Sequence, residues 1–447
     1  MRKGDVVNRL EPKFYLLKYR NNEDRIYKSE FAKYNFKKIT KLISDGTHFT
    51  PKYCDEGIKF LSVKDVRPFQ IDYNNSKFIS VEEADFLDKR CKPQKNDVLL
   101  TKIGTYGLAS VINSDERFQI FVSVALLRPN DKVVLPEFLA LCINSKLIYL
   151  QFERVIKGAG VPDLHLEDIR DIKIPVPPLE VQKQIIEKFE AAYNAKRAKE
   201  AEAKRLLDGI DAYLLERLGI ETPATTETKR FFYRKLSEIT GSRFDANSYH
   251  AERLAAIEAV KNGKYSSNKL KFLTDFPKTI VSETALPYIG LENIESNTGN
   301  FIETSEKQSF GSAIVFSKNQ ILFPKLRPYL NKVYYAEFDG VCSTEFHILD
   351  SKGEGLINEF LANVLRSKII VSQTKHLMSG NTLPRLQTED IENLLIPLPP
   401  VEVQEEIAAH IQSIRTRAKE LEEDAKAEVE RAKVEVEQMI LGEVSAK

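Results

Sequence analysis

The sequence predicts an α+β protein: two similar globular mixed α/β domains joined by two long antiparallel coiled-coil helices, arranged as a pseudo-two-fold duplication. Three observations predict this fold class. The chain has 447 residues, which is too long for one compact core. A long segment occurs twice, and each copy is followed by a long run with helical character.

The duplication is clear from self-comparison. Residues 162–185 align without gaps on residues 384–407, with 13 identities in 24 positions at a constant offset of 222. Upstream segments match in the same order, residues 95–102 over 318–325 and residues 9–15 over 243–249. Internal repeats of this kind predict two copies of one structural unit.

A helix is predicted after each Pro-Pro pair of the repeat. Proline fixes φ for the first turn, and an acidic residue lies near the positive end of the helix dipole. The first run extends from Leu179 to Gly219, with Gly209 as the alternative end, and the second extends from Val401 to Gly442. A helix of about 39 residues would be about 58 Å long at 1.5 Å per residue, which is typical of a spacer.

Both runs have an apolar seam with spacings of three and four residues, which predicts coiled-coil packing. Because small residues at the seam permit close approach, we expect the two helices to pack together; the alternative is two separate surface helices. The predicted seam of the first run consists of Ile185, Phe189, Ala192, Ala203, Leu206, Ile210 and Tyr213. That of the second consists of Ile407, Ile411, Ile414, Ala418, Leu421, Ala425, Val429, Ala432, Val436 and Met439.

Between the repeats, short β-rich runs bounded by Gly, Asn, Asp or Pro predict strands of mixed domains. They are residues 60–63, 97–101, 121–127, 287–291, 320–323 and 332–335. We therefore predict globular domains at residues 1–178 and 229–400, spacer helices at 179–221 and 401–447, and a linker at 222–228.

Charge is distributed unevenly, although the net charge is only +1. Residues 31–157 hold 20 Lys/Arg and 15 Asp/Glu, and residues 229–385 hold 21 and 16. Residues 401–447 hold 7 Lys/Arg and 12 Asp/Glu. Two mildly basic blocks could meet a polyanion while the acidic segment meets another protein; ordinary surface scatter is the alternative.

Motifs for catalysis and cofactor binding are absent from the sequence. There is no nucleotide-binding loop, no His-Glu-x-x-His and no Asp/Asn-Pro-Pro-Tyr/Phe tetrad. His165 and His250 have no ligand at metal spacing. We expect no catalytic residue, no metal site and no bound cofactor in this chain. No apolar run is long enough to span a bilayer, and we expect a cytoplasmic location.

Candidate ligand contacts in the first half lie in two loops. Gly46, Thr47 and His48 form a turn whose hydroxyl and imidazole suit phosphate or base-edge hydrogen bonds. The second loop follows a predicted strand, and its candidate residues are Lys102, Gly104, Thr105 and Tyr106. Its glycines would let the backbone approach a ligand, and its lysine supplies charge. An ordinary turn and a solvated loop are the alternatives.

The matching loop of the second half keeps the lysine and differs in its other side chains. Its candidate residues are Lys325, Arg327, Tyr329 and Asn331, which can pair with phosphate, read guanine, stack or bond adenine. A basic loop at the same place in both copies indicates one shared role, and the differing side chains indicate two different targets.

On these residues the chain resembles the specificity subunit of type I DNA restriction-modification systems. The resemblance rests on the two Ile-Pro-x-Pro-Pro-x-Glu-Val-Gln elements, the loop after residue 97, the Asp-Gly-Thr-His turn at residue 45 and the Arg-Phe-Asp segment at residue 243. It covers essentially the whole chain.

The resemblance implies a division of labour. Each globular half would be a target-recognition domain for one half of a split DNA site, and the paired helices would set the distance between the halves. Two methyltransferase subunits would dock on the chain, and restriction subunits are further candidate partners. S-adenosylmethionine, ATP and Mg would be bound by those partner subunits, where adenine N6 methylation and DNA cleavage take place.

Two other classes of function are weighed against this one. A self-contained restriction and methylation enzyme is disfavoured by the missing catalytic tetrad and cofactor loop. A non-catalytic scaffold of two binding modules that does not bind DNA is disfavoured by the basic loops in both halves.

Overall fold

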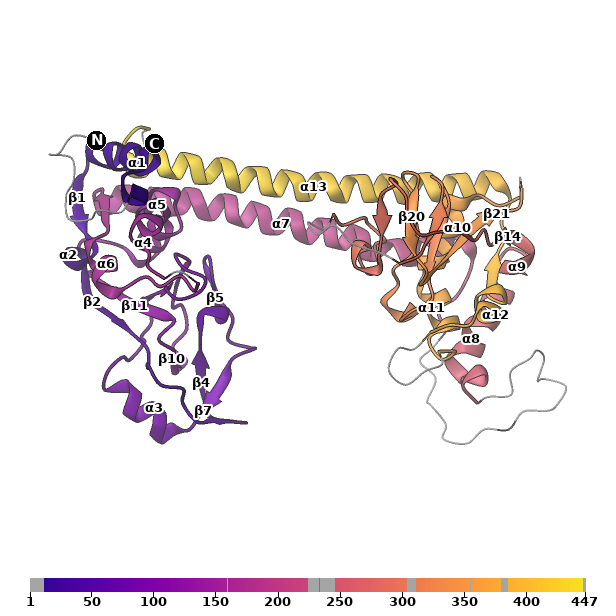
Figure 1. Ribbon diagram of the computed structural model, residues 1–447, viewed down its shortest axis with the longest axis horizontal. Helices are drawn as coiled ribbons and strands as arrows, with labels where there is room; N and C mark the ends of the chain where they lie inside the picture. The colour runs from indigo at the N-terminus through magenta and orange to yellow at the C-terminus, as the bar shows by residue number, and fades with distance from the viewer. Residues whose placement is uncertain are drawn as a thin grey trace. The chain divides into compact units, whose positions relative to one another are not determined.

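The structure is a computed structural model, and it describes residues 12–158, 160–223, 233, 246–303, 311–353, 355–378 and 385–444. The chain divides into two compact units. Unit 1 comprises Met1–Lys199 and Glu423–Lys447, and unit 2 comprises Glu200–Glu422. Two long helices, α7 (Leu179–Leu218) and α13 (Val401–Leu441), each contribute one part to unit 1 and the other to unit 2 (Figure 1, α7 in magenta and α13 in yellow).

Unit 1 is built on two four-stranded sheets. The antiparallel first sheet has the order β2 (Thr40–Asp45), β11 (Val124–Pro129), β8 (Val98–Thr101) and β9 (Ala109–Val111). The second has the order β10 (Phe118–Ile120), β4 (Ile58–Leu61), β7 (Lys77–Ile79) and β3 (Tyr53–Cys54), with β10 and β4 parallel. Small pairs join β1 (Ala32–Asn35) to β12 (Lys173–Val176) and β5 (Val66–Arg67) to β6 (Gln70–Ile71).

Strand β11 separates two of the apolar clusters of unit 1. Because successive side chains of a strand point to opposite faces, Leu126 packs in one apolar cluster and Leu127 in another. A strand buried on both faces has an uninterrupted apolar sequence, as here. The predicted strand at residues 121–127 was placed too early, because Phe121 accepts a hydrogen bond from Val124 N in the turn that joins β10 to β11.

Helices cover the sheets of unit 1 and carry its main core. They are α1 (Leu17–Lys28), α2 (Phe36–Ile39), α3 (Val81–Asp88), α4 (Pro136–Ile143), α5 (Lys146–Val155) and α6 (Leu166–Asp171). The main core contains buried residues of α4 and α5 together with Phe189 of α7 and Met439 of α13. Unit 1 and its segments of α7 and α13 therefore share one apolar core.

Unit 2 repeats this architecture. Its first sheet has the order β14 (Thr274–Asp275), β21 (Phe346–Ser351), β18 (Ile321–Pro324) and β19 (Tyr334–Tyr335). Its second sheet has the order β15 (Thr279–Val281), β17 (Ala313–Phe316), β20 (Gly340–Ser343) and β16 (Tyr288–Ile289). Strand β13 (Ser267–Lys269) pairs with β22 (Leu395–Pro397). Its helices are α8 (Ala251–Lys261), α9 (Leu270–Leu273), α10 (Asn358–Arg366), α11 (Lys368–Thr374) and α12 (Thr388–Glu392).

The prediction of a duplicated α+β fold is confirmed, since the first sheet and the strand pair β1–β12 of unit 1 recur in unit 2 with the same order and directions. The second sheets differ: in the parallel pair, β4 is the inner strand of unit 1 and β20 is the inner strand of unit 2. The proposed domain boundaries stay predictions. Residues 224–228 of the predicted linker, residues 9–11 and residues 243–245 lie outside the described residues.

The helices α7 and α13 pack antiparallel within each unit. In unit 1, Lys199 pairs with Glu428 at 2.7 Å, and Lys188 lies 2.8 Å from its α13 partner Glu435. In unit 2, Arg217 pairs with Glu406 at 2.6 Å. Of the ten seam residues predicted in α13, all except Ile414 are buried. The coiled-coil prediction is confirmed.

Candidate nucleic-acid interface

The turn after β2 holds three of the predicted contact residues, and the structure separates their roles. A Cβ added at Gly46 would lie 1.9 Å from the Ile120 carbonyl oxygen, so only glycine fits there. Thr47 is buried and forms a β-bridge with Phe121. The side chain of His48, by contrast, is 58% exposed. Of this turn, His48 is the side chain that can reach a ligand.

Charges gather around the buried carboxylate of Asp45, at the end of β2. Arg90 Nη2 lies 2.6 Å from Asp45 Oδ1, and His48 Nε2 lies 3.3 Å from the same oxygen. Lys102 Nζ is 3.6 Å from both Asp45 and Asp163. A buried carboxylate needs such partners, because its desolvation is costly without them.

Lys102 belongs to the interior of this cluster. Its side chain is only 6% exposed, and its ammonium lies within ion-pair distance of two carboxylates. Lys102 therefore holds the Asp45 carboxylate, and with it the turn, from the interior of the unit. Arg90, whose side chain is 54% exposed, places positive charge at the surface. Contact of Lys102 with DNA stays a prediction.

The rest of the loop after β8 is more accessible. Thr105 is exposed, and the ring of Tyr106 stacks on Tyr149 with centroids 5.6 Å apart. Gly104 has φ of +79°, and no atom lies within 4 Å of the position of a Cβ there. The positive φ favours glycine at this position, and its backbone N–H donates to Pro162 O.

Two exposed aromatic side chains lie beside the turn, and the sequence interpretation missed them. Phe49 and Phe86 are 50% and 58% exposed, with ring centroids 6.4 Å apart. Phe86 is on α3, and Arg90 follows that helix. We name His48, Phe49, Phe86 and Arg90 the α3 face. Aromatic rings beside cationic side chains suit nucleic-acid bases and phosphates, and the signal in the sequence was the phenylalanine directly after His48.

The corresponding loop of unit 2 carries Lys325, whose Nζ donates to Thr344 O at 2.7 Å. Burial lowers the pKa of Lys325, and the positive charge of Lys278 lowers it further. Lys102 and Lys325 are true structural equivalents, since their carbonyl oxygens accept hydrogen bonds from Leu164 N and Leu386 N respectively. Both lysines are held mainly by the protein itself.

The remaining predicted residues of unit 2 divide into exposed and buried ones. Arg327 precedes the short 3-10 helix η6 (Pro328–Leu330), and Tyr329 lies within it. Both side chains are exposed, and Arg327 makes no ion pair with a described carboxylate. We name these two residues the η6 face. Asn331 is buried and donates to Arg366 O at 2.7 Å. The structure therefore does not bring Asn331 to the surface with the other two.

A different pair replaces the unit 1 charge cluster in unit 2. Arg385 forms a bidentate ion pair with Glu345, with N–O distances of 2.9 and 2.7 Å. The backbone of Arg385 forms an isolated β-bridge with Leu326, and the backbone of Asp163 forms the same bridge with Ile103 in unit 1. The repeat alignment places Arg385 over Asp163, so the sequence carried a signal for this position.

One group of side chains contradicts the expected isolation of His250. His250, Glu252 and His376 have ligand atoms within 4.8 Å of one another and could share a metal ion. The two imidazole rings stack with centroids 3.5 Å apart, and Lys375 Nζ lies 3.0 Å from Glu252. Burial tends to raise the pKa of Glu252, but hydrogen bonds from His376 and Lys375 outweigh it and lower that pKa to about 2. The group is arranged as an ion-pair network that the residue spacing alone did not reveal.

Among the described residues, no helix is both long enough and apolar enough to cross a membrane.

Comparison with known proteins gives consistent results. The type I restriction enzyme EcoBI specificity subunit of Escherichia coli is 29% identical over 138 residues, which cover 31% of this chain and 29% of that protein. The EcoDI specificity subunit, also from Escherichia coli, is 24% identical over 282 residues, which cover 60% of each protein. Both matches span less than two thirds of the relative's length.

A solved structure shares the fold. A chain from a study of complex assembly and conformational transition of the type I R-M system superposes with a TM-score of 0.52 at 15% identity, covering 93% of this chain and 98% of that one. The family model described as "Type I restriction modification DNA specificity domain" matches residues 60–206 and 254–431, well over half of the sequence. The chain belongs to the family of type I restriction-modification DNA specificity proteins.

Proposed function

We propose that this chain is the DNA-specificity subunit of a type I restriction-modification complex, and that each unit reads one half of a bipartite, asymmetric DNA site. The observation that carries the proposal is that one duplicated framework presents different exposed side chains in its two copies. Because the framework is repeated, both units can present a DNA-contacting surface in the same way. Because the exposed side chains differ, the two surfaces would recognise different base sequences.

In unit 1 the α3 face supplies the contacts. Arg90 is held by the buried Asp45 and remains half exposed, so its guanidinium is pre-oriented and can still reach a phosphate or a guanine. Phe49 and Phe86 offer apolar contact at the same place. Loop residues Thr105 and Tyr106 lie after β8 and extend the predicted contact set.

In unit 2 the η6 face takes this role. Arg327 has a left-handed backbone with φ of +48° and no carboxylate partner among the described residues, which leaves its guanidinium available. Arginine bonded to guanine O6 and N7 is the commonest specific contact in the major groove. Tyr329 can stack or donate its hydroxyl.

The long helices serve as spacer and docking surface in this proposal. Nine of the ten predicted seam residues of α13 and three of the seven predicted in α7 are buried. Exposed acidic residues such as Glu402 and Glu420 remain on the outer surface of α13. Two methyltransferase subunits would dock there, joined in restriction complexes by restriction subunits. Those partners would bind S-adenosylmethionine, ATP and Mg and perform the chemistry, and this chain would bind no cofactor.

The test uses the full chain assembled with its methyltransferase and a library of random duplexes. Sequencing the methylated products of the wild type should give a two-part consensus. Arg90→Ala should relax or lose only one part, and Arg327→Ala only the other. Lys41→Ala is the matched control, because Lys41 is an exposed lysine at the opposite end of β2 from Asp45.

The scaffold alternative predicts a different result. If neither arginine variant alters the methylated sequences, and the chain changes only the amount of methylation, the units do not read bases. A consensus in which both parts change together in either variant contradicts independent reading by the two units.

A further inference from the structure

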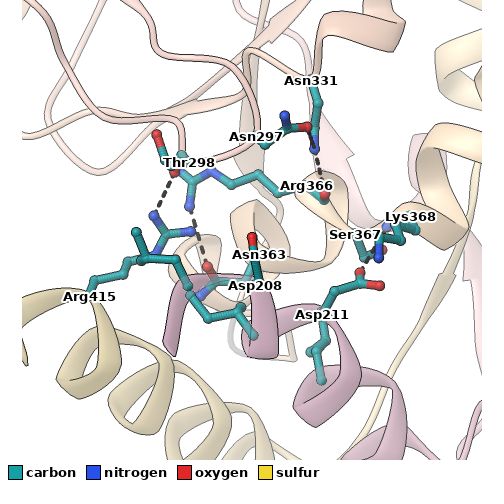
Figure 2. Close-up of a pocket in the computed structure, with 13 residues that line it drawn as sticks. Asp208, Asp211, Asn297, Thr298, Asn331, Asn363, Arg366, Ser367, Lys368 and Arg415 are labelled. Carbon is teal, nitrogen blue, oxygen red and sulfur yellow. Dashed lines mark hydrogen bonds between the residues drawn. The ribbon is translucent and has the colours of Figure 1, made fainter. Parts of the chain in front are cut away.

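Unit 2 contains a pocket of about 500 Å³ between its globular part and its segments of the long helices. Figure 2 shows the polar groups that line it: Asn297, Asn331 and Asn363 from the globular part, Arg366 at the end of α10, and Arg415 on α13. The function proposed above does not use this pocket.

The two arginines enter the pocket without an acidic partner. Arg366 Nε donates to Val333 O at 3.0 Å, and its Nη1 lies 3.3 Å from Asn363 Oδ1. Arg415 Nη1 donates to Thr298 O, while its Nε is shielded from solvent and has no hydrogen-bond partner. All of these partners are neutral, and neither guanidinium makes an ion pair with a carboxylate of the described residues.

The positive charges of Arg366 and Arg415 act on each other. Burial lowers the pKa of the Arg366 guanidinium, and the charge of Arg415 lowers it further; burial also lowers the pKa of Arg415. Arginine does not lose its proton in proteins. Both guanidiniums therefore stay charged, the nearby carboxylate of Glu359 offsets part of their repulsion, and an anion in the pocket would be attracted to both.

Two carboxylates also line the pocket and limit where an anion can sit. Asp211 accepts a hydrogen bond from Lys368 N at 2.9 Å, and it lies on the Ser367–Lys368 side in Figure 2. Asp208 is exposed and makes no ion pair with Arg366 or Arg415. An anion would bind at the arginine side, and Asp208 would weaken its binding.

The duplication supplies an internal comparison. Unit 1 has a cavity of about 450 Å³ at the same place in its fold, lined by Phe69, Leu141, Phe189 and Tyr193. The rings of Phe69 and Phe189 lie 4.6 Å apart, and those of Phe189 and Tyr193 5.9 Å apart. These four side chains form the apolar part of the lining, and polar and charged side chains form the rest: Asn113, Glu137, Glu190, Asn194 and Arg197.

Four polar residues of the unit 2 pocket have defined counterparts in unit 1. Arg415, Arg366 and Asn363 lie 222 residues after Tyr193, Asn144 and Leu141, the offset of the sequence repeat. Asn297 corresponds to Phe69, since both have positive φ and donate a backbone N–H to the equivalent carbonyls of Asn331 and Ala109. Three of these differences replace Phe69, Leu141 and Tyr193 of the unit 1 cavity by Asn297, Asn363 and Arg415. The fourth places Arg366 in the unit 2 pocket where unit 1 has Asn144, which does not line its cavity.

We propose that this pocket of unit 2 is an oxyanion site that takes a phosphate group, held by the guanidiniums of Arg366 and Arg415 with the side-chain amides around them. Guanidinium groups match the oxygens of phosphate in pairs of parallel hydrogen bonds. The phosphate could belong to a free phosphate compound or to the DNA backbone, and the experiment separates these two sources.

The first measurement is titration of the full chain with inorganic phosphate by calorimetry, at constant ionic strength adjusted with chloride. We expect saturable binding of one phosphate. Arg415→Gln should weaken it roughly tenfold or more, as expected for loss of a charge-assisted hydrogen bond. Asp208→Asn should tighten binding, because it removes a negative charge from the rim. Arg417→Gln, on the exposed side of the same helix, is the matched control and should have no effect.

The second measurement uses a labelled duplex and the chain assembled with its methyltransferase. If the site takes a DNA phosphate, inorganic phosphate at constant ionic strength should compete with the duplex in the wild type and not in Arg415→Gln. If it takes a free phosphate, duplex binding should be insensitive to phosphate while calorimetry still shows the site.

Absence of saturable phosphate binding overturns the proposal, as does equal binding by wild type and a folded Arg415→Gln variant. Should that variant fail to fold, Asp208→Asn decides, and phosphate binding that Asp208→Asn leaves unchanged overturns the proposal. If Arg415→Gln impairs only assembly with the methyltransferase, the pocket takes an acidic side chain of that partner and the phosphate proposal is wrong. None of the calorimetric outcomes depends on the chain's role in DNA reading.

Discussion

Gln182 and Gln404 make the same set of hydrogen bonds in the two units. Gln182 Oε1 accepts from Leu135 N at 2.9 Å, and its Nε2 donates to Val133 O and Pro177 O. Gln404 Oε1 accepts from Ile357 N at 2.9 Å, and its Nε2 donates to Gly355 O and Pro399 O. Both side chains are completely buried.

These bonds give a physical reason for the repeated Pro-Pro-x-Glu-Val-Gln motif. The prolines direct the chain from strands β12 and β22 into the long helices. The glutamine on the first turn then satisfies three backbone groups of neighbouring segments that water cannot reach. The motif joins each spacer helix rigidly to its globular unit.

Replacing Gln182 by Leu should destabilise unit 1 selectively. It leaves the N–H of Leu135 and two carbonyl groups buried without partners, at a cost of about 2–4 kcal/mol. Hydrogen exchange should quicken around α4 and the start of α7. Gln404→Leu is the internal control and should act on α10 and the start of α13. Uniform loss of protection over both units in either variant would contradict this local role.

Lys102 and Arg90 should behave differently, because one is buried and the other half exposed. Lys102→Met removes a partner of buried Asp45 and should lower the stability of the free chain by about 2 kcal/mol. This cost is smaller than that of leaving the carboxylate without any cationic partner, because Arg90 remains. Arg90→Ala also removes a partner of Asp45, but a half-exposed one, so it should cost less stability than Lys102→Met while weakening DNA binding by the assembled complex. Thermal unfolding measures the stability of each variant, and duplex titration measures its DNA binding. A Lys102 variant with normal stability and weakened DNA binding would contradict this account and show that Lys102 contacts DNA directly.

Arg327 and Asn331 provide a second contrast, within one loop. Arg327→Ala should relax the choice at one base pair by about 1–3 kcal/mol if the lost contact is bidentate. Asn331→Ala should leave base choice unchanged, since its amide is bonded to Arg366 O inside the unit. The readout is methylation of duplexes with single substitutions, and altered base choice in the Asn331 variant would contradict its buried placement.

His347 should make unit 2 sensitive to acid. Burial, with the charges of Lys325 and Lys278, lowers the pKa of His347 from 6.5 to about 4. Between these pH values the unfolded chain binds the proton and the folded one does not, so stability falls as pH drops from about 6.5 to 4, by up to about 3 kcal/mol. His347→Phe should remove this part of the loss. Hydrogen exchange of β21 against pH measures it, and identical profiles of variant and wild type would contradict the account.

The sequence predicted the framework well because the framework is encoded by local patterns. The seam residues of α13 recur at helical spacing, and the repeat alignment already paired Gln182 with Gln404. The prediction could not show that Lys102 is buried, since that depends on Asp45 and Asp163, which come from distant segments. Exposure of a loop side chain is a tertiary property.

The same limit applies to the polar sites of the two units. The His250–Glu252–His376 group joins residues more than 120 positions apart, and the arginine pocket joins α10 with α13. Neither has a continuous motif. Phe49 and Phe86 also lie on separate elements, so their proximity was not evident from either neighbourhood.

The central claim is that two units read two half-sites at a distance fixed by α7 and α13. Inserting seven residues into each helix, near Ala198 and Lys426, keeps the seams in phase and lengthens the pair by about 10 Å. At about 3.4 Å per base pair this corresponds to three additional unread base pairs. The measurement is methylation of duplexes that differ only in the gap between fixed half-sites. We predict an optimum shifted by about three base pairs with both half-sites unchanged; an unshifted optimum, or equal methylation at all gaps, would contradict the account.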